Sequence, residues 1–123
     1  LAMPHIALGP VGETTVRAVM AHADIVLSSS SYESFGATLL EGQAAGATPV
    51  GYTHDGRADI ISDGATGYSG GTDPTDARAL ARALTRALTQ PIPAERLAAG
   101  AARFSGEAVA RRYLDLLAQD AGA

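Results

Sequence analysis

The chain has 123 residues, of which 46% are hydrophobic and 18% charged, and its formal net charge is −4. This length allows one domain with a single small core, while the negative charge and the lack of a basic run argue against a nucleic-acid or anionic-membrane partner. With no cysteine and only three histidines, far apart, the sequence predicts neither a disulfide framework nor a metal site.

The first expected elements are a strand and a helix. Residues 6–8 form a short apolar run that stops at a Gly-Pro-Val-Gly segment, residues 9–12, which predicts a buried strand followed by a turn. A helix should follow, with Glu13 or Thr14 as its N-terminal cap. The apolar residues that recur at helical spacing in it are Val16, Val19 and Met20.

A second strand, a second helix and a third strand come next. Residues 25–27 form a β-branched run that predicts a central strand, and four serines follow it. From Gly36 the pattern becomes helical, with Ser34 as a candidate cap and Gly46 as a stop signal. The third strand is expected over residues 48–52.

Beyond that strand the pattern becomes mainly helical. The polar residues 54–57 predict a turn, and residues 66–69 predict a short last strand. Helices are predicted over residues 74–89, 93–102 and 106–118. The stripe that should enter the core from the first of these helices consists of Leu80, Leu84 and Leu88.

Short apolar strands that alternate with helices predict an α/β domain with a parallel sheet covered on both faces. Such sheets bind ligands at the carboxyl ends of their strands. The apolar runs are too short to cross a bilayer and the first residues do not resemble a signal peptide, so we expect a cytoplasmic protein.

The most informative pattern follows the strand at residues 25–27. A loop of small residues leads into a helix whose first amides lack intrahelical partners, which suits a phosphate group, and Gly36 allows a ligand close to the backbone. Glu33 precedes this helix, and Glu41 lies about one turn inside it. Both carboxylates can therefore flank one anionic ligand, with Glu33 holding a sugar and Glu41 a ribose through their hydroxyls.

This pattern resembles the two-glutamate motif of the retaining GT-B glycosyltransferases, the group 1 glycosyl transferase family. That motif has a Glu, a Phe-Gly pair, a second Glu eight positions after the first, then small residues, a Gly and Pro-Val. The corresponding positions here are Glu33, Phe35, Gly36, Glu41, Gly46, Pro49 and Val50. Residues 6–9 and 59–68 resemble neighbouring elements of the same family, so the resemblance covers nearly the whole chain.

The resemblance implies transfer of a sugar from a nucleotide-diphosphate sugar to an acceptor with retention of configuration, without a cofactor or metal. Glu33 would be the catalytic carboxylate at the donor sugar, Glu41 would bind the ribose, and Val11 would lie near the nucleobase. The donor sugar and diphosphate would contact Glu33 together with Ser34, Phe35, Gly36, Ala37, Thr38 and Leu39. The acceptor, which is a sugar, a glycan or a lipid-linked molecule, stays open, as do the donor base and sugar.

The fold implied for residues 1–123 is the C-terminal half of a GT-B donor domain, a partial doubly wound, Rossmann-like sheet with a helical C-terminus. The acceptor domain and the first donor-domain strands, with the basic residues that neutralise the diphosphate, would then precede this chain. We therefore expect an inactive fragment whose exposed strand edges favour self-association. For the full-length enzyme a membrane-peripheral position is an alternative to a purely cytoplasmic one.

Other interpretations stay open. The chain is alternatively a non-catalytic module that binds a nucleotide or sugar phosphate, or an inert folding fragment. The serines at residues 28–31 are better explained as a polar loop than as a hydrolase nucleophile, because none of them lies in a Gly-x-Ser-x-Gly elbow. Phe35 is expected to be a packing anchor. His54 is a secondary candidate for substrate contact because it follows the third strand.

Overall fold

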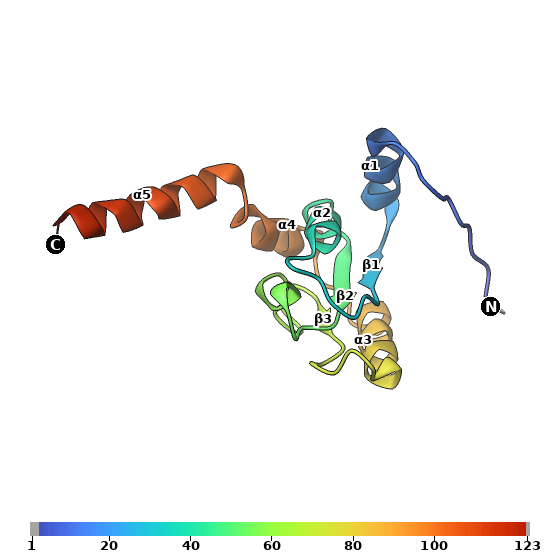
Figure 1. Cartoon of the computed structure of the whole chain (residues 1–123). Helices are drawn as coiled ribbons and strands as arrows, with labels where there is room; N and C mark the ends of the chain where they lie inside the picture. Colours follow the sequence, from blue (N-terminus) through green and yellow to red (C-terminus); the bar gives the residue numbers. More distant parts are fainter. Residues whose placement is uncertain (1–2, 123) are drawn as a thin grey trace.

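The computed structural model describes residues 3–122, which form a three-stranded parallel sheet surrounded by helices (Figure 1). The strands, in their order across the sheet, are β1 (Ile25–Ser28), β2 (Thr48–Gly51) and β3 (Tyr68–Ser69). The helices are α1 (Glu13–His22), α2 (Ala37–Ala44), the 3-10 helix η1 (Gly56–Asp59), α3 (Ala77–Thr89), α4 (Ala94–Ala102) and α5 (Gly106–Gly122). The α/β class and the parallel sheet expected from the sequence are confirmed.

The register of the sheet brings the carboxyl ends of all three strands to one edge. Ser28 lies opposite Gly51, and Gly51 lies opposite Ser69. The segments that leave these strands are joined further by Thr53, whose Oγ1 lies 2.7 Å from Ser69 Oγ and whose N–H donates to the Gly71 carbonyl at 3.0 Å. Residues far apart in the sequence therefore meet at this edge, where parallel sheets bind ligands.

Different helices cover the two faces of the sheet (Figure 1). Because successive side chains of a strand point to opposite faces, Ile25 packs towards α3 while Val26 packs towards α2. The cluster on the α3 side consists of Val50, Tyr52, Tyr68, Leu80, Ala83, Ala87, Ile92 and Leu97. The cluster on the α2 side consists of Leu39, Ile60 and Ile61, with Val26, Leu40 and Phe104 packed against it.

The core stripe of α3 differs from the expected one. Leu80 is buried and Leu84 partly buried, but Leu88 is 67% exposed, and the other core positions are Ala83 and Ala87. Residues four apart on a helix are offset by about 40° around its axis, so two such steps turn a side chain well away from the core. Alternating steps of three and four residues, from Leu80 through Ala83 to Ala87, stay on one side.

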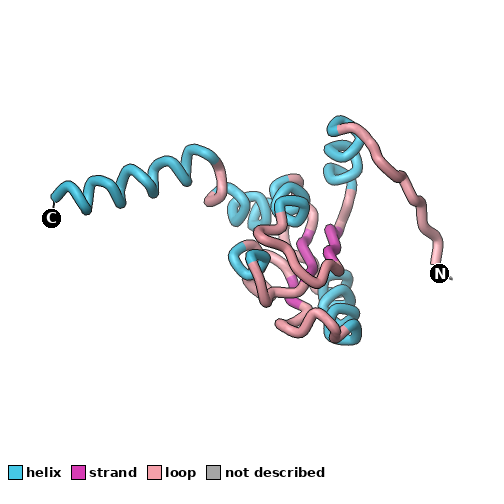
Figure 2. Tube along the Cα trace, in the orientation of Figure 1, coloured by secondary structure: helices cyan, strands magenta, loops and turns pink. Residues whose placement is uncertain are grey.

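The expected strand at residues 6–8 is absent. Residues 4–9 form no helix or strand, and Figure 2 shows this stretch as a loop that runs away from the sheet. Ile6 is 86% exposed, so its apolar run is not buried. A strand needs a neighbour for its backbone hydrogen bonds, and in the part of the chain that the structure describes β1 pairs only with β2. β1 is thus an edge strand of this sheet, not the central strand predicted.

Local capping also differs from expectation. The residue before α1 is Gly12, so neither Glu13 nor Thr14 caps that helix. Gly36 precedes α2 with a φ of 93°, and no side chain caps this helix either, so the prediction for Ser34 was wrong. The left-handed backbone at this position is one that glycine adopts without strain.

Helix α5 runs four residues further than predicted and points away from the rest of the molecule (Figure 1). None of its described residues is buried. Its large apolar residues are exposed at helical spacing: Val109, Tyr113, Leu116 and Leu117. Within residues 3–122, neither α5 nor any other helix combines the length and the apolarity that crossing a membrane requires.

The close contact between α2 and β1 generates a stability prediction. A Cβ atom at Gly42 would lie 2.9 Å from Val26 Cβ, so Gly42→Ala should overpack this contact and lower the free energy of unfolding by about 1–3 kcal/mol. Gly106→Ala is the matched control, because a Cβ there meets nothing within 4 Å. Urea denaturation measures both variants, and a Gly42→Ala protein as stable as the unmodified chain would contradict the packing.

Candidate functional site

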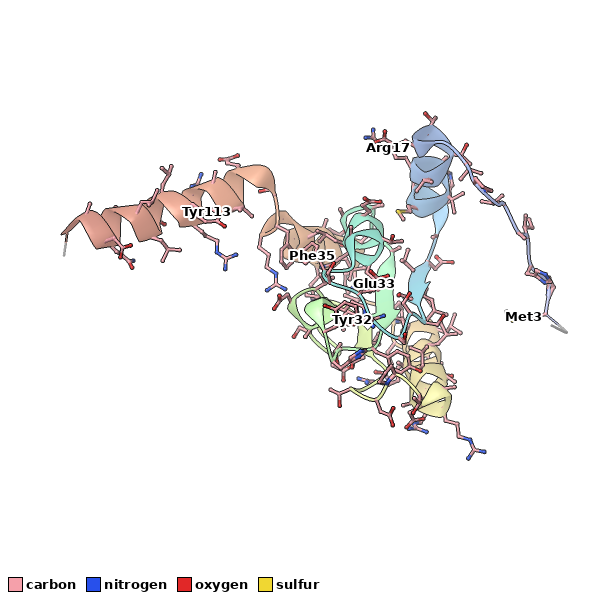
Figure 3. All side chains as sticks on the ribbon, in the orientation of Figure 1. Met3, Arg17, Tyr32, Glu33, Phe35 and Tyr113 are labelled. Atoms are coloured by element: carbon pink, nitrogen blue, oxygen red, sulfur yellow. The ribbon has the colours of Figure 1, made fainter. Side chains whose placement is uncertain are left out.

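The loop between β1 and α2, residues 29–36, lies at the carboxyl edge of the sheet and is called the site loop here. It holds Tyr32, Glu33 and Phe35, which Figure 3 shows near the middle of the molecule. Tyr32 is 71% exposed, Glu33 is partly buried, and Gly36 is buried at the start of α2. The predicted sequence of strand, loop and helix around Glu33 is therefore formed.

The N-terminus of α2 has no side-chain cap in the part of the chain that the structure describes. Its cap is Gly36, which has no side chain, and no other side chain within residues 3–122 caps the helix. The first amides of an α-helix have no intrahelical acceptor and carry partial positive charge. Leu39 is one of the predicted donor contacts, but only 1% of it is exposed. Its backbone can therefore contact a ligand, whereas its side chain cannot. An uncapped helix start of this kind suits an anion.

Asp55, which follows β2, holds the site loop through the amide of Glu33. The Glu33 N–H donates to Asp55 Oδ2 at 2.8 Å. Asp55 also accepts from three nitrogens of Arg57: the backbone N at 3.1 Å, Nε at 3.0 Å and Nη2 at 2.7 Å. Both side chains are buried, with 2% of Asp55 and 0% of Arg57 exposed. This bidentate pair leaves little of either charge for solvent.

The neighbouring glycines make room for these contacts. A Cβ at Gly56 would lie 2.7 Å from Phe35 Cα, so only glycine lets η1 approach the site loop this closely. The aliphatic part of Arg57 passes beside Gly36 and Gly51, where added Cβ atoms would lie 2.9 Å from Arg57 Cγ and 3.6 Å from Cδ. The guanidinium then reaches Ser28, with Nη1 donating to Oγ at 3.2 Å.

The electrostatics of Asp55 follow from this geometry. Hydrogen bonds from the Arg57 side chain, aided by the backbone amides of Arg57 and Glu33, hold the pKa of Asp55 well below the ordinary value for an aspartate. These donors outweigh the burial of the carboxyl group, which acts in the opposite direction. Asp55 is therefore an anion in the folded protein at neutral pH.

Phe35 makes an aromatic packing contact, although 36% of the residue is exposed. Its ring lies edge-on to Phe104, with 5.4 Å between the centroids and 69° between the planes. Such edge-to-face pairs are a favoured aromatic arrangement. The contact joins the site loop to the segment between α4 and α5, so the loop is held from two sides.

Glu41 lies on an exposed face of α2, at a cavity of about 560 Å³ between α1 and α2. The residues that line this cavity are Glu13, Val16, Arg17, Met20, Glu41, Ala44 and Ala45. Neither Glu33 nor Val11 is among them, and Val11 is 39% exposed. The structure therefore places the two predicted carboxylates on the same strand–loop–helix unit without bringing both into one cavity.

Asp55 and Arg57 are candidate site residues that the sequence does not single out, because the polar residues 54–57 predict a simple turn. The usable signal was their position directly after the third predicted strand, at the ligand-binding edge. His54, the secondary candidate, lies beside them with Nε2 3.5 Å from Asp55 Oδ2. In residues 3–122 no three His, Cys, Asp or Glu side chains form a group that could hold a metal ion.

The Asp55–Arg57 pair generates a prediction for the dependence of stability on pH. Because the pKa of Asp55 is lower in the folded than in the unfolded chain, its interactions stabilise the protein above about pH 4 and are lost as the pH falls further. Asp55→Asn should therefore lower the free energy of unfolding at pH 7 by about 3–5 kcal/mol, the range for breaking a buried pair. It should also reduce the loss of stability between pH 5 and pH 2.

Urea denaturation across this pH range is the measurement. Asp63→Asn is the control, because Asp63 pairs with Arg86 at 2.9 Å but is 46% exposed. Exposed pairs contribute about 0–1 kcal/mol, so this variant should change little. An Asp55→Asn protein that matches the unmodified chain at pH 7 would contradict the role of the pair.

Comparison with known proteins gives one family. The sequence model of the family described as "Glycosyl transferases group 1" matches residues 4–104. No curated protein matches the chain. The matched range begins before α1 and ends at Phe104, so it includes the whole sheet, the site loop and the 55–57 segment.

Proposed function

Because this match spans most of its residues, the chain belongs to the group 1 glycosyl transferases, and we propose that it supplies the donor site of a retaining enzyme. The family implies a nucleotide-sugar donor and an acceptor. The observation that carries the proposal is the uncapped start of α2 next to Glu33, at the carboxyl edge of a parallel sheet. This arrangement supports binding of a diphosphate at the helix amides with a sugar beside it.

Glu33 is the proposed contact for the donor sugar. Its amide is bound by Asp55, while within the described residues its carboxylate takes part in no hydrogen bond or ion pair. A carboxylate held in this way can accept hydrogen bonds from two sugar hydroxyls. We assign the backbone contacts of the sugar and diphosphate to residues 34–39.

Glu41 is the proposed contact for the ribose. Its cavity of about 560 Å³ has the size of a small-molecule site and a mainly apolar wall from α1 and α2. The hydroxyls of a ribose can donate to the Glu41 carboxylate while the base lies against this wall. Val11, at the end of the segment before α1, is the proposed neighbour of the base.

The proposed reaction uses no cofactor or metal, and basic residues beyond this site share the charge of the diphosphate. The bond between the anomeric carbon and the phosphate oxygen breaks, and the acceptor oxygen bonds to the same face of the sugar. The leaving diphosphate gains negative charge, which the first amides of α2 stabilise, and a phosphate oxygen takes the proton of the acceptor hydroxyl. Glu33 orients the sugar during this step.

The role of Glu41 is tested by Glu41→Ala in the intact enzyme. We expect the KM for the donor to rise about tenfold, because the variant loses hydrogen bonds between a charged group and the ribose hydroxyls. Glu95→Ala is the matched control, since Glu95 is an exposed glutamate in the first turn of α4 and lines no part of the cavity. Steady-state kinetics with UDP-glucose, GDP-mannose and ADP-glucose identify the donor first, and an unchanged KM would refute the ribose contact.

We further propose that the 123-residue chain alone transfers no sugar. Arg57, the arginine that contacts the site loop, is already bound by Asp55, so the positive charge for the diphosphate must come from residues beyond this site. Incubation of the purified chain with each of the three nucleotide sugars should release no nucleotide. Detectable turnover would contradict this proposal. If the intact enzyme binds a nucleotide sugar tightly but transfers no sugar, a binding module is favoured instead.

A further inference from the structure

Three consecutive residues after β2 contact the end of β1 and the second half of the site loop. Arg57 donates to Ser28 where β1 ends, and Asp55 accepts from the amide of Glu33. Gly56 lies against the backbone of residues 34 and 35, and the stem of Arg57 lies against Gly36 where α2 begins.

We propose that Asp55 and Arg57 are positioning residues for the donor sugar: they hold the site loop so that the Glu33 carboxylate faces the sugar-binding side. This inference rests on the proposed function, in which Glu33 contacts the donor sugar. The Asp55–Arg57 pair lies at the site, but its two charges are neutralised by each other and do not bind a ligand. Positioning the loop is the role that we infer for it.

The geometry separates this role from direct binding. Both oxygens of Asp55 are occupied by Arg57 and by the Glu33 amide, and the Arg57 side chain is 0% exposed. Neither group can therefore touch the diphosphate or the sugar. Their effect must pass through the backbone of Glu33, whose amide they hold at 2.8 Å.

The geometry also separates this role from general stabilisation. A buried ion pair stabilises a fold no better than well-packed apolar residues of the same size. What apolar residues cannot supply is an acceptor for the Glu33 amide together with a donor for the Ser28 hydroxyl. The pair is thus suited to setting the direction of the loop, which is what a sugar contact requires.

The test compares the affinity for a nucleotide sugar with that for the bare nucleotide in the intact enzyme, by calorimetry. The probe pairs are UDP-glucose with UDP, GDP-mannose with GDP, and ADP-glucose with ADP. The quantity compared is the affinity for the nucleotide sugar divided by that for the bare nucleotide. For the pair that binds, Asp55→Asn should lower this ratio about tenfold, while the affinity for the bare nucleotide stays unchanged. An equal loss for both ligands would mean a merely structural role and would overturn the proposal, as would an unchanged ratio.

Asp63→Asn is the matched control, because it makes the same chemical change in the Asp63–Arg86 pair, which is far more exposed. This variant should leave the ratio as it is. Should Asp55→Asn fail to fold, Ser28→Ala replaces it, since this variant removes only the hydroxyl that Arg57 Nη1 contacts. A smaller fall in the ratio is then expected, and an unchanged ratio overturns the proposal.

Glu33→Ala distinguishes failure of this inference from failure of the proposed function. If Glu33→Ala leaves the ratio unchanged, or no nucleotide binds at all, the donor contact itself is wrong. If Glu33→Ala lowers the ratio and Asp55→Asn does not, only the positioning role is wrong. If both lower it, the double variant should show no further loss, because the two residues act through one contact.

Amide hydrogen exchange supplies a readout that needs no ligand. Asp55→Asn should speed exchange at the Glu33 amide, whose acceptor it weakens, by a larger factor than at the buried amide of Val50 in β2, which reports the fall in global stability. A change at Glu33 no larger than that at Val50 would overturn the proposal, because the loop would then be held by something other than Asp55.

Discussion

Burial of the Arg57 guanidinium is the constraint on which the arrangement of this site depends. A charge removed from water is strongly unfavourable unless it is paired and hydrogen-bonded. Asp55 supplies the opposite charge, Ser28 accepts the remaining contact, and Gly36 and Gly51 leave space for the stem. Because these partners come from β1, β2 and the start of α2, satisfying one side chain aligns three elements. The loop after β1 is consequently attached to the segment after β2, which is its neighbour in space but not in sequence.

The sequence predicts well those features that depend on local signals. The β-branched run of β1, the small residues before α2 and the glycine at its start place the strand, loop and helix around Glu33 correctly. Prediction from the sequence fails where contacts with other parts of the chain determine the structure. Residues 6–8 have the composition of a strand but no described strand to pair with, and Leu88 continues an apolar stripe that the rotation of α3 carries into solvent. The buried position of Arg57 depends on its partners, so an arginine in a polar stretch gives no local sign of it.

The parts of the molecule that lie away from the sheet do not take part in this arrangement. The extended residues before α1 and the long helix α5 leave the body in different directions (Figure 1), and α5 has no buried residue. The site loop is held instead by residues 55–57 and by Phe104, which packs against the apolar cluster on the α2 side. The proposed sugar contact and the proposed ribose contact differ in this respect, because the cavity at Glu41 has α1 as its other wall.

The contacts that hold the site loop join residues 22 and 29 positions apart in the chain. Such non-local contacts form only after the intervening segment has been closed, and this intervening segment contains the whole of α2 and β2. The site loop therefore cannot become ordered ahead of the sheet. A ligand that binds the ordered loop therefore shifts the folding equilibrium of β1, α2 and β2 towards the folded state. Ligand affinity and the folding free energy of this unit are thus thermodynamically linked.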